Sequence, residues 1–195
     1  MYSPPEFVET RLDVLLGLIE ANPLGTVVTH DADGLAANHI PFEIVAPSAD
    51  APYGLLRAHV ARANPLARQD AQQTMAVFQG QSAYITPAWY EEKALSGKVV
   101  PTWNYAAVHA HGVLRNIDDP VWMLALLTRL TEQHEGKRAA QWQVEDAPPQ
   151  FITRLMGALV GIEIRIERLD GKFKLSQNKS ARDRTRIAEG LRTGI

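Results

Sequence analysis

The sequence contains no cysteine among its 195 residues. Disulfide frameworks, thiolate metal sites and cysteine nucleophiles are therefore excluded. It also lacks an apolar run long enough to cross a membrane, because proline, glycine or charge interrupts each candidate. Residues 1–9 hold two prolines and two acids, not the basic start and apolar stretch of a signal peptide. We therefore expect a cytoplasmic protein.

Several motifs that identify enzymes or DNA-binding proteins are also missing. The sequence has no glycine-rich turn between a strand and a helix, which argues against a Rossmann nucleotide site. No Ser-His-Asp spacing, nucleophile elbow or pair of acids predicts hydrolytic chemistry. A helix-turn-helix does not fit the strand-rich middle of the chain.

The charge is small in total but unevenly distributed. Residues 171–195 hold seven basic residues and two acids, a net charge of about +5 in a chain whose net charge is −2. The rest of the chain therefore carries about −7. Such a basic segment can contact nucleic acid or phosphate, or it can form the solvated face of a helix.

The hydrophobic pattern predicts one helix, many short strands, two further helices, a last hairpin and a C-terminal helix. Thr10 and Asp13 resemble a capping box at the start of the first helix. Gly80 separates two predicted strands, and the pair Asp170-Gly171 predicts a turn inside the last hairpin.

Short antiparallel strands joined by tight turns favour a barrel over a doubly wound sheet. The predicted fold class is therefore α+β, mainly antiparallel β, with a barrel and peripheral helices. We expect a single domain over residues 1–195 that ends in the basic C-terminal segment 171–195.

Residues 57–65 combine the features of a phosphate site. A predicted strand carries His59 and Arg62 to a helix start that Asn64 caps and Pro65 opens. The free N–H groups of a helix start and the fork of an arginine both suit a phosphate. The alternative is an ordinary helix cap beside a surface arginine.

His109 and His111 share one face of a predicted strand, and such a pair can begin a metal site. The next acid is Asp118, beyond a turn, and the sequence offers no cysteine as a further ligand. We therefore expect no metal and interpret these histidines as hydrogen-bonded strand residues.

Two aromatic clusters, at residues 88–90 and 103–105, suit a planar ligand or a protein interface, or else pack in the core. Residues 172–180 combine basic, amide and hydroxyl side chains just before a predicted helix start. They form a second candidate anion site, or a solvated turn.

Six segments, found in order along nearly the whole chain, carry a resemblance to a known family. They are residues 1–4, 38–42, 59–65, 84–90, 100–105 and 174–179. The most specific are the stretches PTWNYA and KLSQN. The sequence resembles the PaiB-like family of FMN-binding split-barrel proteins, labelled negative transcriptional regulators. Lys179 stands where arginine is usual in that family.

The resemblance implies a six-stranded split barrel, as in pyridoxamine-phosphate oxidases and flavin reductases, and a homodimer with FMN at its interface. Family members are labelled repressors of sporulation and protease synthesis, a genetic description that does not establish contact with DNA. The implied function is that of an FMN-binding regulator. The alternatives are an FMN-dependent oxidoreductase or flavin reductase and an interaction module with an empty barrel.

The resemblance also assigns roles to residues. Arg62 and the helix start at Asn64 are expected to bind the FMN phosphate, and residues 39–41 and 59–60 to lie along the flavin and its ribityl chain. Residues 103–105 are expected to close the pocket from the partner subunit, and residues 177–179 to complete its polar wall. The expected cofactor-binding residues are His39, Ile40, Pro41, His59, Val60, Arg62, Asn64, Trp103, Asn104, Tyr105, Gln177, Asn178 and Lys179.

Overall fold

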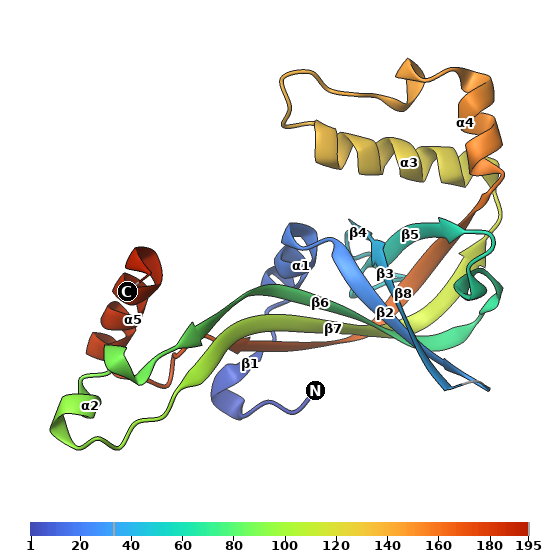
Figure 1. Ribbon diagram of the computed structural model, residues 1–195. Coiled ribbons are helices and arrows are strands. Elements are labelled where there is room, and N and C mark those ends of the chain that lie inside the picture. Colours follow the sequence, from blue (N-terminus) through green and yellow to red (C-terminus); the bar gives the residue numbers. More distant parts are fainter. Residues whose placement is uncertain (33, 195) are drawn as a thin grey trace.

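The computed structural model describes residues 1–32 and 34–194, and its centre is one antiparallel sheet curled into a barrel (Figure 1). The strand order is β3-β2-β6-β7-β8-β5-β4, and β1 pairs with β8. The strands are β1 (Val8–Glu9), β2 (Leu24–Asp31), β3 (Gly34–Pro41), β4 (Glu43–Val45), β5 (Leu55–Ala61), β6 (Gln72–Ile85), β7 (Thr102–Ile117) and β8 (Leu159–Lys174). Apart from the short β1 and β4, six long strands remain in the described chain. The prediction of a six-stranded split barrel with peripheral helices is confirmed.

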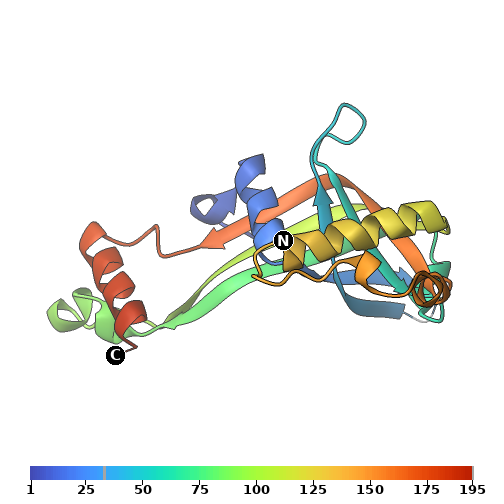
Figure 2. The same ribbon diagram turned by 90° about the horizontal axis from the view of Figure 1, so that it is seen from above.

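The helices lie around this sheet rather than in a separate layer (Figure 2). The α-helices are α1 (Leu12–Ala21), α2 (Glu92–Leu95), α3 (Pro120–Glu135), α4 (Pro149–Met156) and α5 (Ala181–Thr193). Four short 3-10 helices are η1 (Pro5–Phe7), η2 (Pro65–Arg68), η3 (Pro87–Trp89) and η4 (Val144–Asp146). Asp119 caps α3, because its carboxylate accepts from the backbone N–H of Val121 at 2.8 Å.

The core fills the inside of the barrel. Every second residue of β5 and β8 points inward, so that Leu56, Ile162 and Ile164 are fully buried. Helix α1 contributes Leu15 and Ile19 to the same cluster and thereby closes one opening of the barrel. The other face of these strands points outward, away from the core, and is available to bind a ligand or a partner.

Strands β6 and β7 continue beyond the barrel as a long ribbon (Figure 1). Their register shifts between Gln79 and Ser82, and a bulge of this kind increases local twist and bends the ribbon. At its far end α5 packs on η3, around a small second core of Ile85, Tyr90 and Ile187. We call residues 80–104 together with residues 174–194 the arm.

Three local predictions are wrong. Gly80 does not separate two strands, because β6 continues through it as part of the bulge. Asp170-Gly171 is not a turn, because β8 runs unbroken to Lys174. Gly171 is needed for close packing: a Cβ there would lie 2.3 Å from Leu15 Cδ2. Thr10 does not cap α1, which begins at Leu12 with Arg11 as the preceding residue.

Glu9 organises the entry to α1 in place of the predicted cap. Its Oε1 accepts from the backbone N–H groups of Thr10 and Arg11 at 3.0 and 2.9 Å. Its carboxylate also pairs with the Arg11 guanidinium at 2.6 Å, and these bonds lower the pKa of Glu9 to about 2. The ionised carboxylate therefore stabilises the folded state.

Glu9→Gln is expected to lower the free energy of unfolding by about 1 kcal/mol at pH 7, a figure reduced for solvent screening. Because the folded pKa lies below the ordinary value of 4.5, this contribution is present above that value and is lost as pH falls toward 2. Urea unfolding at pH 7 and pH 3 checks the sign. A difference between wild type and variant that grows on acidification would contradict the assignment.

Candidate functional site

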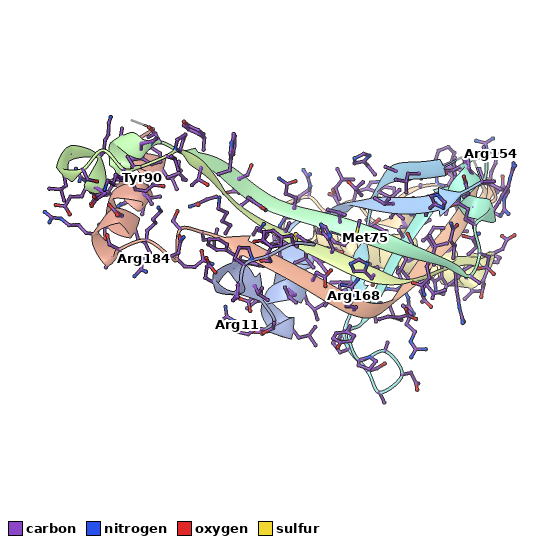
Figure 3. All side chains as sticks on the ribbon, turned by 90° about the horizontal axis from the view of Figure 1, so that it is seen from below. Arg11, Met75, Tyr90, Arg154, Arg168 and Arg184 are labelled. Atoms are coloured by element: carbon purple, nitrogen blue, oxygen red, sulfur yellow. The ribbon has the colours of Figure 1, made fainter. Side chains whose placement is uncertain are left out.

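The outward face of strands β6, β7 and β8, which are neighbours in the sheet, forms the candidate site. Figure 3 looks onto it, with Met75 of β6 and Arg168 of β8 near the middle of the ribbon. A shallow cavity of about 600 Å³ lies there, between Val77 and Gln79 of β6 and Trp103, Tyr105 and His109 of β7. This volume lies within the range of small-molecule and cofactor sites.

Aromatic rings border this cavity. Trp103 is 56% exposed, and its ring lies edge-to-face against Tyr84 with centroids 5.9 Å apart. The Lys172 ammonium lies 5.4 Å from the centroid of Tyr105. Exposed aromatic side chains of this kind are enriched where proteins bind planar ligands or partners.

The two histidines of β7 differ in environment. His111 Nε2 lies 3.1 Å from Asp170 Oδ2, so this side chain has a carboxylate partner. Burial lowers the pKa of His109, and repulsion from the Met1 amine and from His111 lowers it further. His109 therefore gives up its proton more readily than an ordinary histidine.

His59 lies at the other end of the barrel, beneath α3. It lines a cavity of about 320 Å³ with Pro41, Leu130 and Trp142. Its Nδ1 is buried and has no hydrogen-bond partner among the described residues, and burial lowers the pKa of the ring. A buried polar atom without a partner is unusual in a folded protein and suits a site that receives a ligand.

Arg62 follows β5 at the same end, and its hydrogen bonds are largely made within the chain. Its two terminal nitrogens donate to the Asp118 carboxylate at 2.9 and 2.7 Å. Its Nε donates to the carbonyl of Gly157 at 3.1 Å, and one terminal nitrogen also donates to the carbonyl of Leu159 at 3.0 Å. A guanidinium has five N–H donors, so one is left for a phosphate.

Asn64 caps η2, a 3-10 helix of four residues. Its Oδ1 accepts from the backbone N–H of Leu66 at 2.9 Å, and its Nδ2 donates to Asn38 Oδ1 at 2.9 Å. Both ends of the amide are thus engaged in local structure. The role of Arg62 and Asn64 in holding a phosphate stays a prediction.

The C-terminal site residues lie on the arm. Asn104, Asn178 and Lys179 border one small cavity there. Gln177 instead braces the arm, since its Nε2 donates to the carbonyl of Glu6 at 2.9 Å and its Oε1 accepts from the N–H of Leu175 at 2.7 Å.

Within one protomer the predicted site residues fall into separate groups. Pro41, His59, Arg62 and Asn64 lie at the barrel end, whereas Asn104, Asn178 and Lys179 lie on the arm. Figure 3 shows how far apart these ends are, with Arg154 of α4 at one end and Tyr90 and Arg184 of the arm at the other.

The remaining predicted residues, His39, Ile40 and Val60, lie on strands β3 and β5 of the sheet. His39 of β3 is exposed, and its register partner in β2 is Thr26. The side chains of Ile40 and Val60 belong to the barrel core, so their backbone is the part within reach of a ligand.

Sequence reasoning missed His109 and Gln79 as residues of the outward cavity. Strand alternation would have found His109, because residues 103, 105, 107 and 109 share one face of β7. Gln79 was missed because the sequence predicts that its strand ends near Gly80.

A family model described as "Putative FMN-binding domain" matches residues 1–168. A Bacillus subtilis relative named protease synthase and sporulation protein PAI 2 is 30% identical over 193 residues, covering 98% of this chain and 89% of the relative. The chain belongs to the PaiB-like FMN-binding family. Its match to the family model ends before the arm's C-terminal half, residues 174–194.

Two further comparisons show what else this PaiB-like protein is similar to. An uncharacterized protein of Emericella nidulans is 35% identical over 226 residues, covering 98% of this chain and 90% of that protein. The solved structure of the FAD and heme binding protein from Mycobacterium smegmatis superposes with a TM-score of 0.62 at 16% identity, covering 94% and 80% of the two chains. This second likeness supports the fold of the PaiB-like protein.

Within residues 1–32 and 34–194, no helix of the PaiB-like protein is long and apolar enough to span a membrane. No group of three or more histidine, aspartate or glutamate side chains in that part lies close enough together to hold a metal ion.

Proposed function

We propose that the protein is a cytoplasmic homodimer that binds FMN between its subunits and acts as a regulator of the PaiB-like type. The observation that carries this proposal is the uncovered outward face of the sheet. It combines a cavity of about 600 Å³ with exposed rings and the Gln79 amide. Aromatic and apolar walls suit an isoalloxazine ring, and amides suit its polar edge.

The residues present fit an FMN group. The unpartnered Nδ1 of His59 is a buried polar atom that a ligand can satisfy. The exposed indole of Trp103 offers a stacking surface, and the lysines of the arm offer cationic donors. When bound, FMN would supply redox chemistry, while the protein supplies binding and orientation.

The separation of the predicted residues supports a dimer. In a two-fold dimer each subunit uses the same surface twice, so one protomer can contribute two different half-sites. The barrel end with His59 and the arm with Lys179 are two such candidates. Both would meet at one flavin if the arm of each subunit reached the barrel end of the other.

Spectroscopy of the purified full-length protein tests the proposal. We expect flavin absorbance in the purified protein, or quenching of flavin fluorescence on titration with FMN. Mass analysis of the ligand released on denaturation is expected to identify FMN, and sedimentation to give twice the monomer mass. A monomer that neither carries nor takes up flavin would refute it.

Two other roles depend on further measurements. Oxidation of NAD(P)H in the presence of a small acceptor would favour the FMN-dependent oxidoreductase. Nucleic-acid contact through residues 171–195 stays a prediction, and part of that charge is already used within the arm. Arg182 pairs with Glu91 at 2.7 Å, and Arg184 donates to the carbonyls of Gln177 and Lys179.

A further inference from the structure

The arm carries a small cationic notch of about 150 Å³ that the outward cavity does not include. Tyr90, Val100 and Pro101 border it, together with the polar side chains of Thr102, Asn104, Lys174, Ser176, Asn178 and Lys179. These polar side chains come from the start of β7, from the end of β8 and from the loop that follows β8. A water molecule occupies about 30 Å³ in the liquid, so the notch has room for roughly five groups of the size of a water molecule.

Tyr90 gives the notch a buried hydrogen-bonding group. Its side chain is only 3% exposed, and its hydroxyl has no hydrogen-bond partner among the described residues. Asn104 borders the same notch, and its Oδ1 accepts from the Ser176 hydroxyl at 2.9 Å. A buried hydroxyl without a partner is destabilising, so a ligand that accepts its hydrogen bond is favoured.

Two lysines add positive charge to the same notch. The Lys179 ammonium lies 4.8 Å from the centroid of the Tyr90 ring, and Lys174 donates to the Thr102 hydroxyl. Neither forms an ion pair with a carboxylate of the described residues. Two acids of the arm are engaged elsewhere, since Glu91 pairs with Arg182 and Asp183 accepts from the backbone N–H of Glu91 at 3.0 Å.

The positive charge at the notch has no carboxylate partner, whereas the positive charge of Arg62 has one. Arg62 is neutralised by Asp118 and donates to two carbonyls, which leaves it one free N–H, whereas Lys174 and Lys179 have only neutral partners. A doubly charged anion gains more from two unpaired ammonium groups than from an arginine that must first leave a carboxylate.

We propose that this notch, and not Arg62, binds a terminal phosphate group, with Lys174, Lys179 and the Tyr90 hydroxyl as its donors. The inference rests on the proposed function in one respect: the phosphate it assigns to the notch is that of FMN. Free phosphate shares this chemistry and is separated from FMN by the experiment.

Paired titrations of the full-length dimer with FMN and with riboflavin, which lacks the phosphate, test the assignment. Lys174→Gln and Lys179→Gln are each expected to weaken FMN binding about tenfold and to leave riboflavin binding within about twofold. Lys179→Arg is expected to retain FMN. Lys137→Gln, an equal change of charge at an exposed position after α3, is the matched control and is expected to change neither affinity.

Each outcome decides the inference. Equal losses of FMN and riboflavin, unchanged FMN binding, or a selective loss of FMN in Arg62→Gln alone would overturn it. If wild type binds neither flavin, the proposed function fails, and inorganic phosphate then tests the notch. Phosphate at constant ionic strength is expected to raise Tm of wild type and not of the Lys174→Gln/Lys179→Gln double variant. No rise in wild type would refute the notch as a phosphate site.

Discussion

Gly112→Ala is expected to destabilise the barrel by about 3 kcal/mol, at the upper end of the usual cost of overpacking. Gly112 lies where the register of β7 and β8 shifts. A Cβ built on it would lie 1.9 Å from the carbonyl oxygen of Arg165 and 2.8 Å from its carbonyl carbon. Both obstacles are backbone atoms of a paired strand, so no rotation of a side chain can relieve the clash. The two central strands would have to separate locally.

Gly17→Ala is the matched control for this substitution. Gly17 lies on the exposed side of α1, and nothing lies within 4 Å of a Cβ built there. Alanine in a helix is favoured over glycine by about 0.5–1 kcal/mol, so this variant is expected to be more stable than wild type. Urea unfolding followed by tryptophan fluorescence, at one protein concentration, measures both. A Gly112→Ala variant within 0.5 kcal/mol of wild type would contradict the packing argument.

The fold was predictable where local signals and global structure agree. Asp119 and Pro120 start α3 as their residue types predict, and alternation in β8 correctly divides Ile162 and Ile164 from the outward Glu163. Two of the three local errors arose at glycines. A glycine in a sequence indicates either a turn or a close approach of neighbouring atoms. At Gly171 the reason for glycine is contact with Leu15, about 155 residues away in sequence, which no local pattern reveals.

The candidate site was predictable to a lesser extent, for a related reason. Residue type and spacing indicated which side chains suit a phosphate, but not which of them already have partners. Arg62 is followed by a capped turn, as a phosphate site would be, yet its carboxylate partner Asp118 is 56 residues further along the chain. Conversely, the stretch around Lys179 was the second candidate anion site, with a solvated turn as the alternative. Its distinction is that Tyr90 lies beside Lys179 with a buried hydroxyl that has no partner among the described residues, and only the folded chain brings the two together.

Trp103→Ala is expected to weaken the proposed dimer by at least 2 kcal/mol, which corresponds to about thirtyfold in dissociation constant. Trp103 is 56% exposed at the outward cavity, and its indole is supported edge-to-face by Tyr84. A large ring held in place but left in water gains apolar burial on association at little cost in side-chain entropy. Removing the indole leaves Tyr84 without its neighbour. The loss of association free energy should therefore exceed the part that burial of the indole surface alone contributes.

Leu35→Ala is the control for this effect. Leu35 is 77% exposed at the start of the edge strand β3 and borders neither the outward cavity nor the cavity at His59, so it tests whether loss of any exposed apolar group weakens association. Dilution series followed by sedimentation or mass photometry give both dissociation constants. If the two variants dissociate alike, or if Trp103→Ala dimerises as tightly as wild type, the outward face is not the interface. In that case the exposed indole must serve a ligand within one subunit, and the same Trp103→Ala variant would then lose flavin quenching while its mass stays unchanged.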